Sequence, residues 1–153
     1  MATRTFELTA TVPVDPDAAI DFLMDLARHR GLHPFLVSAE VVATGSDDDA
    51  GPWWDWRVLE RPRLGPIHYP IRFPARMQRT SPTTMVGDVR AAPGCTLVTS
   101  TSAEPTDGGA VLHETTTVSA PRLLLGYMAS QAHEAHARTY SLLPGELAGQ
   151  RSG

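Results

Sequence analysis

The chain has 153 residues, the length of one domain, and its 42% hydrophobic and 20% charged content is typical of globular rather than disordered chains. The net charge of −4 argues against nucleic acid as a partner, because phosphate binding needs a concentrated basic face. One cysteine, Cys95, excludes an internal disulfide framework and a multi-cysteine metal site, and the lack of lysine excludes Schiff-base chemistry.

The chain shows no targeting or membrane-spanning pattern. Its N-terminus lacks an apolar run of signal-peptide length, and no stretch approaches the roughly 18 apolar residues that a membrane helix requires. All 13 basic residues are arginine, which is typical of a high-GC coding bias. We therefore expect a bacterial protein of the cytoplasm with no integral membrane segment.

The N-terminal third predicts one strand and one or two short helices. Phe6 to Val14 alternates between apolar and polar residues, as a half-buried strand does. Asp15-Pro16 then combines an N-cap aspartate with a proline at the first helical position. Apolar residues at helical spacing follow, up to Leu26. Gly31 and His33-Pro34 end this region, so we expect one short helix, or two with a bend near Ala27 to His29.

Six further strands follow, joined by short turns. They are predicted over Phe35–Thr44, Trp53–Arg61, Ile67–Gln78, Met85–Ala91, Cys95–Ala103 and Ala110–Val118. Short connections allow only antiparallel neighbours. The strand over Ile67–Gln78 shows the cleanest alternation, but Pro70 and Pro74 each remove a backbone donor, which predicts an edge strand or a bulge.

The last element is predicted to be a long helix that begins at Pro121. Its apolar stripe, at spacings of three and four, comprises Leu124, Met128, Ala132, Ala135, Thr139 and Leu142. Pro144-Gly145 is expected to break it, which leaves residues 144–153 as a frayed tail. Strands grouped between terminal helices indicate an α+β fold. We predict a helix-grip fold, in which a curved antiparallel sheet of about seven strands surrounds the C-terminal helix and an internal cavity can remain.

This order of elements resembles the START-like superfamily, also called the polyketide cyclase/dehydrase or SRPBCC family. The resemblance rests on Val12-Pro13-Val14-Asp15-Pro16, on the helix after it, on His33-Pro34-Phe35 before a valine-rich strand, and on the meander and final helix. It spans roughly Thr5 to Leu147 and implies a single START-like domain over residues 1–153. Members include lipid and hormone carriers, aromatase/cyclases, hydrolases and regulatory proteins. No catalytic signature forms part of the match.

Aromatic and methionine side chains predict an apolar cavity wall. Within Trp53-Trp54-Asp55-Trp56, alternation sends Trp54 and Trp56 to one side, and aromatic walls suit apolar ligands, although ordinary core packing would use the same residues. The other predicted ligand-binding residues are Tyr69, Phe73, Met77 and Met85 on the strands and Met128, Ala132 and His136 on the last helix. Threonines of the two last strands could hydrogen-bond the oxygen atoms of a ligand.

Three side chains are candidates for acid–base catalysis: Tyr69, His113 and His136. His133 and His136 are three residues apart on the last helix, a spacing that does not fit the metalloprotease helix, and no third ligand accompanies them. We therefore expect neither a metal nor another cofactor.

Three functions remain open at this level. The sequence favours binding of a small apolar molecule, lipid-like or aromatic, in the cavity. The alternatives are an enzyme of the cyclase or aromatase type that uses His and Tyr as acid–base groups, and a dimeric interaction or regulatory module that uses Trp53 and the outer edge as an interface. The protein is expected to be a monomer or a homodimer.

Overall fold

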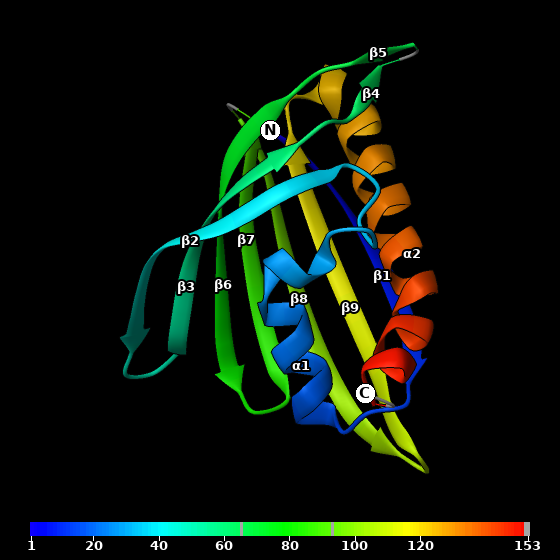
Figure 1. Cartoon of the computed structure of the whole chain (residues 1–153). Helices are drawn as coiled ribbons and strands as arrows, with labels where there is room; N and C mark the ends of the chain where they lie inside the picture. The colour runs from blue at the N-terminus through cyan, green and yellow to red at the C-terminus, as the bar shows by residue number, and fades with distance from the viewer. Residues whose placement is uncertain (65, 93, 152–153) are drawn as a thin grey trace.

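The computed structural model describes residues 1–64, 66–92 and 94–151. Its seven-stranded antiparallel sheet has the order β1-β9-β8-β7-β6-β3-β2 (Figure 1). The strands are β1 (Ala2–Val12), β2 (Leu36–Asp47), β3 (Gly51–Glu60), β6 (Ile71–Ser81), β7 (Thr84–Ala92), β8 (Cys95–Thr106) and β9 (Gly109–Ala120), with a separate two-stranded ribbon of β4 (Arg63–Leu64) and β5 (Ile67–His68). The helices are α1 (Pro16–Met24), the 3-10 helix η1 (Leu26–His29) and α2 (Arg122–Arg151). The predicted helix-grip fold is confirmed.

The region after β1 forms the two short helices that the sequence allowed. Asp15 is extended at the N-cap, Pro16 opens α1, and α1 ends at Met24. The Asp25 carboxylate then accepts a hydrogen bond from the backbone N–H of Ala27 at 3.2 Å, which starts η1. This second helix carries His29 toward the middle of the sheet.

The long strand predicted over Ile67–Gln78 is divided in two. β5 ends at His68 and β6 begins at Ile71, so Pro70 lies between them. The prediction of an edge strand is wrong for β6 as a whole, which lies between β3 and β7, although residues 71–74 pair with β3 alone. Pro74 pairs with Arg57 of β3 and has no partner in β7, since the β6–β7 ladder begins only at Ala75. The missing N–H of Pro74 therefore removes no bond from the β6–β7 ladder.

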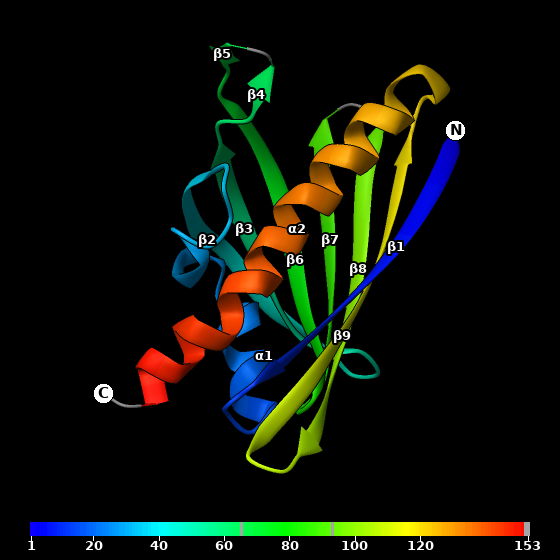
Figure 2. The same ribbon diagram turned by 90° about the vertical axis from the view of Figure 1, so that its right-hand side faces the viewer.

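Helix α2 crosses the sheet obliquely on the side of β1 and β9 (Figure 2). Its buried face comprises Leu125, Ala129, Ala132, Ala135, Thr139, Tyr140, Leu143 and Leu147. Leu124 and Leu142, which we predicted in the apolar stripe, are 47% and 38% exposed. The middle of the predicted stripe, Ala132, Ala135 and Thr139, is buried as expected, whereas its two ends were placed one residue too early, since Leu125 and Leu143 are buried instead of Leu124 and Leu142.

The C-terminal segment is helical rather than frayed. α2 continues through Pro144 to Arg151, and Leu147 is only 2% exposed. A proline within a helix removes one backbone hydrogen bond, and burial of Leu143 and Leu147 on either side of Pro144 offsets that loss. The prediction of a tail from residue 144 is thus wrong as far as residue 151, and residues 152 and 153 lie outside the described part.

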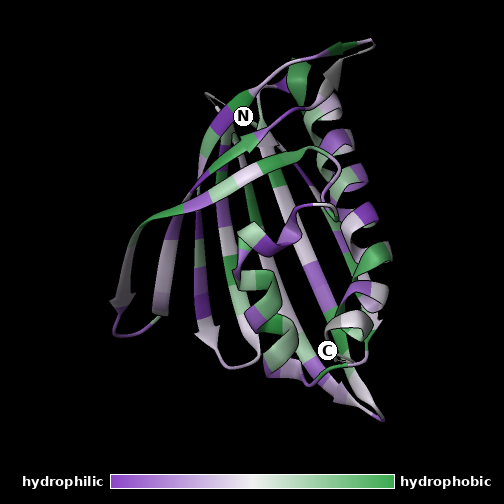
Figure 3. Cartoon of the chain, in the orientation of Figure 1, coloured by the Kyte–Doolittle hydropathy of each residue, from purple (hydrophilic) through white to green (hydrophobic). Residues whose placement is uncertain are grey.

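The core consists of two clusters with different locations. One joins α1, the C-terminal half of α2 and the sheet, and it includes Ile20, Phe22, Leu112 and Leu143. The other packs the N-terminal half of α2 against β8 and β9 through Leu97, Val118, Leu125 and Ala129. Apolar and polar segments alternate along the strands, as expected for a sheet with one face on the core (Figure 3). No helix among the described residues is long and apolar enough to span a membrane.

Replacement of Leu147 tests the extent of α2. We expect Leu147→Ala to lower the free energy of unfolding by about 2–4 kcal/mol, because a nearly fully buried leucine is truncated. Leu142→Ala on the same helix is the matched control, and because Leu142 is 38% exposed it should cost less than about 1 kcal/mol. Urea denaturation measures both, and equal small effects would show that the end of α2 is frayed in solution.

Candidate functional site

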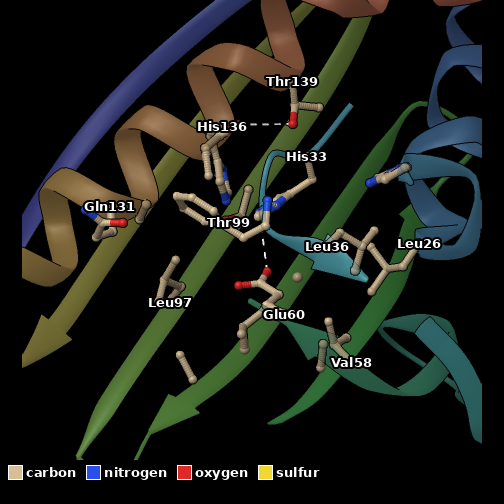
Figure 4. A pocket seen from close by; sticks show the side chains of 18 of the residues that line it. Leu26, His33, Leu36, Val58, Glu60, Leu97, Thr99, Gln131, His136 and Thr139 are labelled. Carbon is tan, nitrogen blue, oxygen red and sulfur yellow. Dashed lines mark hydrogen bonds and ion pairs between the residues drawn. The ribbon is translucent and has the colours of Figure 1, made fainter. Parts of the chain in front are cut away.

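A cavity of about 230 Å³ lies between the concave face of the sheet, the middle of α2, and η1 with the segment after it. Residues of both core clusters line it, so it separates them. Its apolar wall comes mainly from Leu23, Leu26, Leu36, Val58, Phe73, Met85 and Leu97, some of which are seen in Figure 4. Its polar wall contains His29, His33, Glu60, Glu114, His136 and Tyr140.

Most of the predicted ligand-binding residues line this cavity. They are Tyr69, Phe73, Met77 and Met85 from the strand side, and Met128, Ala132 and His136 from α2. The pattern of alternation was sufficient to place Phe73, Met77 and Met85, because one face of β6 and of β7 is buried at these positions. The two indoles assigned to the same wall do not reach it.

Trp54 and Trp56 belong to the core rather than to the cavity wall. Trp56 is 6% exposed, and Trp54 packs partly buried against the same core cluster. Both precede Val58 and Glu60, which lie further along the same face of β3 and line the cavity. The third indole, Trp53, lies on the other face under the guanidinium of Arg76, at 3.9 Å from its ring centre.

His113 does not face the cavity. It is exposed on β9, where its neighbours Leu112 and Glu114 are buried. Successive side chains of a strand point to opposite faces, so the inward position of Glu114 sends His113 outward. His133 is also exposed. Of the predicted catalytic candidates, the structure brings only Tyr69 and His136 to the cavity.

His136 forms an ion pair with Glu114 that joins α2 to β9. The Nδ1 atom of His136 contacts Oε1 of Glu114, and the Thr116 hydroxyl donates to the same oxygen at 2.8 Å. Burial alone would lower the pKa of His136, but the charge of Glu114 outweighs it and raises that pKa above its ordinary value. Burial would likewise raise the pKa of Glu114, but the charge and hydrogen bond of His136 lower it. Both partners are therefore charged near neutral pH.

His33 and Glu60 form a second pair with the opposite electrostatics. Nε2 of His33 lies 3.4 Å from Oε1 of Glu60 (Figure 4). Burial lowers the pKa of His33 to about 3, assisted by the positive charge of His136, so this imidazole is neutral. Burial also raises the pKa of Glu60 to about 7. The Glu60 carboxyl thus exchanges its proton near neutral pH, which suits a general acid or base.

The two pairs lie next to one another in the cavity. The rings of His33 and His136 have centroids 6.5 Å apart, and they belong to segments a hundred residues apart in the chain. His29 completes the group: its Nε2 donates to the carbonyl of Phe22 at 3.1 Å, since a carbonyl can only accept, and burial lowers its pKa to about 4. The pair of neutral His33 and proton-exchanging Glu60 therefore lies beside the charged pair of His136 and Glu114.

Three tyrosines complete the polar part of the wall. The hydroxyls of Tyr69 and Tyr127 are 2.7 Å apart and link the segment after β5 to the first turns of α2. Burial and this hydrogen bond raise the pKa of Tyr69 to about 12. The buried hydroxyl of Tyr140 lies near Glu114 and Thr101, although its geometry is not that of a regular hydrogen bond. Burial, together with the charge and nearness of Glu114, raises the pKa of Tyr140. Tyr140 therefore keeps its proton, which it can donate to Glu114 or to a ligand oxygen.

The sequence analysis missed His33, Glu60, Glu114 and Tyr140. The strand pattern held a signal for the two carboxylates. Glu60 continues the face of Trp56 and Val58, and Glu114 falls on the face of Leu112 and Thr116, so each is a charged residue at an inward position. No comparable signal existed for His33, which precedes a strand. Among the described residues, no cluster of three or more His, Cys, Asp or Glu side chains could hold a metal ion.

Comparison with known proteins identifies the fold. No family model and no curated protein sequence matches the chain. Among solved structures, the Zhui aromatase/cyclase from Streptomyces sp. R1128 is similar, with 12% identity, a TM-score of 0.70, and coverage of 96% of this chain and 94% of that one. A START superfamily protein from Mycobacterium smegmatis has 11% identity, a TM-score of 0.67, and coverage of 95% and 98%.

A third similar structure is norcoclaurine synthase of Thalictrum flavum, a point mutant in complex with a transition state analogue. It has 12% identity and a TM-score of 0.66, with coverage of 98% of this chain and 97% of that one. At such identities the likeness establishes the architecture and no activity. The chain therefore has a START-like, or SRPBCC-like, helix-grip fold, and the resemblance inferred from the sequence is confirmed at the level of the fold.

The raised pKa of Glu60 predicts a pH-dependent stability. Between the ordinary value of 4.5 and about 7, the folded protein keeps a proton on Glu60 that the unfolded chain releases, so stability falls as pH rises through this window. We expect Glu60→Gln to raise the free energy of unfolding by about 1–3 kcal/mol at pH 8, where the buried carboxylate is charged, and to change it little near pH 4. Urea denaturation at the two pH values checks this, and an equal effect at both would contradict the raised pKa.

Proposed function

We propose that the protein binds a small, mostly apolar molecule that carries an oxygen substituent, within the cavity under α2. The observation that carries this proposal is the composition of the wall: apolar side chains line one part, and a compact polar group that includes Glu60, His33 and the Tyr140 hydroxyl lines another. Buried polar groups are almost always hydrogen-bonded, so an oxygen substituent of the ligand would bind against this polar part of the wall.

The size of the cavity limits the ligand. A dry apolar cavity of roughly 150 Å³ accommodates benzene, and the sites of drug-sized ligands span roughly 300–1,000 Å³. The present cavity, of about 230 Å³, lies between these values. It therefore suits a molecule of one or two rings or a medium-length aliphatic chain. The likeness to a START superfamily protein and to an aromatase/cyclase supports a ligand-binding role.

A cavity-filling substitution tests binding. N-phenyl-1-naphthylamine, an uncharged apolar dye, should become fluorescent with the unmodified protein. Ala132→Phe should weaken this binding at least tenfold, because Ala132 is buried and lines the cavity. Ser130→Phe adds the same side chain on the exposed side of α2 and is the matched control. Thermal unfolding verifies that both variants are folded. Equal dye affinities of the two variants would then contradict binding in this cavity.

Acid–base catalysis on the bound molecule is the second candidate function, and one observation favours it. Glu60 has a pKa of about 7 beside a neutral imidazole, while His136 is held charged by Glu114 at a centroid distance of 6.5 Å from His33. Titratable groups whose environments push their pKa values apart commonly divide the roles of acid and base. In this mechanism Glu60 moves the proton, and the Tyr140 hydroxyl donates a hydrogen bond to the ligand oxygen as negative charge develops on it.

Hydrogen exchange of a simple ketone tests this second function. With 2-tetralone in deuterated buffer, the protein should accelerate loss of the acidic protons next to the carbonyl, and proton NMR follows it directly. Glu60→Gln should lower the acceleration by about 10²-fold or more, which is the usual contribution of a positioned base. His113→Gln is the control, because His113 is exposed outside the cavity. If the unmodified protein does not accelerate the exchange, the acid–base function is excluded and ligand binding remains the proposed function.

A further inference from the structure

The sheet separates locally between β6 and β7. These strands pair from Ala75–Val89 to Ser81–Thr84, whereas residues 71–74 of β6 pair with β3 alone. The two strands diverge toward the end of the sheet that carries β4 and β5 (Figure 2). An outer groove lies over this divergence and the adjoining part of β8, lined by Ile71 and Arg72 of β6, Asp88 and Arg90 of β7, and residues of β8 such as Thr96. On its β6 side the groove thus lies where no backbone ladder joins β6 to β7.

Only a thin wall separates this groove from the internal cavity. Ile71 and Ala91 line both the outer groove and the cavity. Both side chains are partly exposed. A side-chain wall is easier to displace than a hydrogen-bonded strand pair, because no backbone bond is broken. The divergence is therefore the place where an extended chain could pass through the sheet.

The outer groove carries an unbalanced positive charge. Arg72 and Arg90 are exposed, and neither forms an ion pair with a described residue. Neighbouring arginines differ in this respect, because Arg57 pairs with Glu40 and Arg76 with Asp55. Among the described groove residues, Asp88 is the one acid. A local positive site on a chain of net charge −4 points to an anion as its partner.

The interior of the cavity is unsuited to that anion. The charge of His136 is already neutralised by Glu114, and Glu60 becomes negative as its proton leaves. An anionic ligand group placed there would meet two carboxylates. Arginine, by contrast, presents a planar fork of donors that matches a carboxylate.

We propose that the groove between β6 and β7 holds the carboxylate of an amphipathic ligand, whose apolar part enters the cavity between Ile71 and Ala91. This inference rests on the proposed function, since it assigns the apolar part of the ligand to the same cavity. It adds a chemical class, an apolar carboxylic acid, and a route through the side of the sheet. Arg72 and Arg90 bind the carboxylate, and Phe73 and Val89, next to the opening, meet the apolar chain.

Two matched ligands and two matched variants test the inference. The ligands are decanoate and decan-1-ol, which share an apolar chain and differ in charge at about pH 8. The variants are Arg72→Gln/Arg90→Gln and the control Arg4→Gln/Arg138→Gln, which removes the same number of charges from exposed positions outside the groove. Calorimetric titration should show the groove variant binding decanoate about 5- to 10-fold more weakly and decanol unchanged. Added salt should weaken only decanoate binding.

The outcomes separate this inference from the function on which it rests. Binding of both ligands by the unmodified protein, with loss confined to decanoate in the groove variant, supports both proposals. Unchanged decanoate affinity in the groove variant, or an equal loss in the control variant, overturns the anion site and leaves the cavity function standing. Binding of decanol but not decanoate by the unmodified protein likewise overturns the anion site and leaves the cavity function standing. If neither ligand binds, both proposals fail.

Discussion

The buried ion pair between His136 and Glu114 fixes the geometry on which the rest of the site depends. Glu114 is 5% exposed at an inward position of β9. A carboxylate so placed is tolerated only with a partner, because an unpaired buried charge costs several kcal/mol or more. Its partner lies on α2, and Thr116 and Thr99 extend the hydrogen bonds along the sheet, at 2.8 and 2.9 Å. The pair therefore sets where α2 sits on the sheet, and this position brings the ring of His136 beside that of His33.

The cavity exists because small side chains of α2 meet a sheet that bends away from it. Ala132 and Ala135 face the sheet at the middle of the helix, where longer side chains would fill the space. Toward the C-terminus, Tyr140, Leu143 and Leu147 reach the cluster that α1 completes. Gly87 makes a similar contribution on β7, since a Cβ atom there would lie 3.1 Å from the sulfur of Met77. The same alternation of small and large residues that stabilises the two clusters leaves the cavity between them.

The fold was predictable from the sequence because it depends on repeated patterns. Alternation along strands such as β6 and β9 and the helical spacing of α2 each draw on many residues, so local errors at Pro70 or Leu124 did not change the architecture. The site depends instead on single residues. His136 was found because it lies on a regular helix, and Tyr69 because it continues the alternation that runs into β6. The role of His33, by contrast, arises from a non-regular segment that packs onto β3. Trp54 and Trp56 were misplaced because alternation specifies a face of the sheet and not a distance along it.

The apolar and polar parts of the cavity wall adjoin one another, and this arrangement makes ligand binding and acid–base catalysis compatible functions of the same cavity. Apolar residues such as Phe73 and Met85 surround the body of a ligand and exclude water, which raises the strength of every charge interaction inside. The same exclusion is what raises the pKa of Glu60 to about 7 and lowers that of His33 to about 3. Exclusion of water therefore both favours binding of an apolar molecule and shifts the pKa values of Glu60 and His33 beside it. A second charge within this region would disturb both effects, and the exposed arginines of the β6–β7 groove lie outside it, on the far side of Ile71 and Ala91.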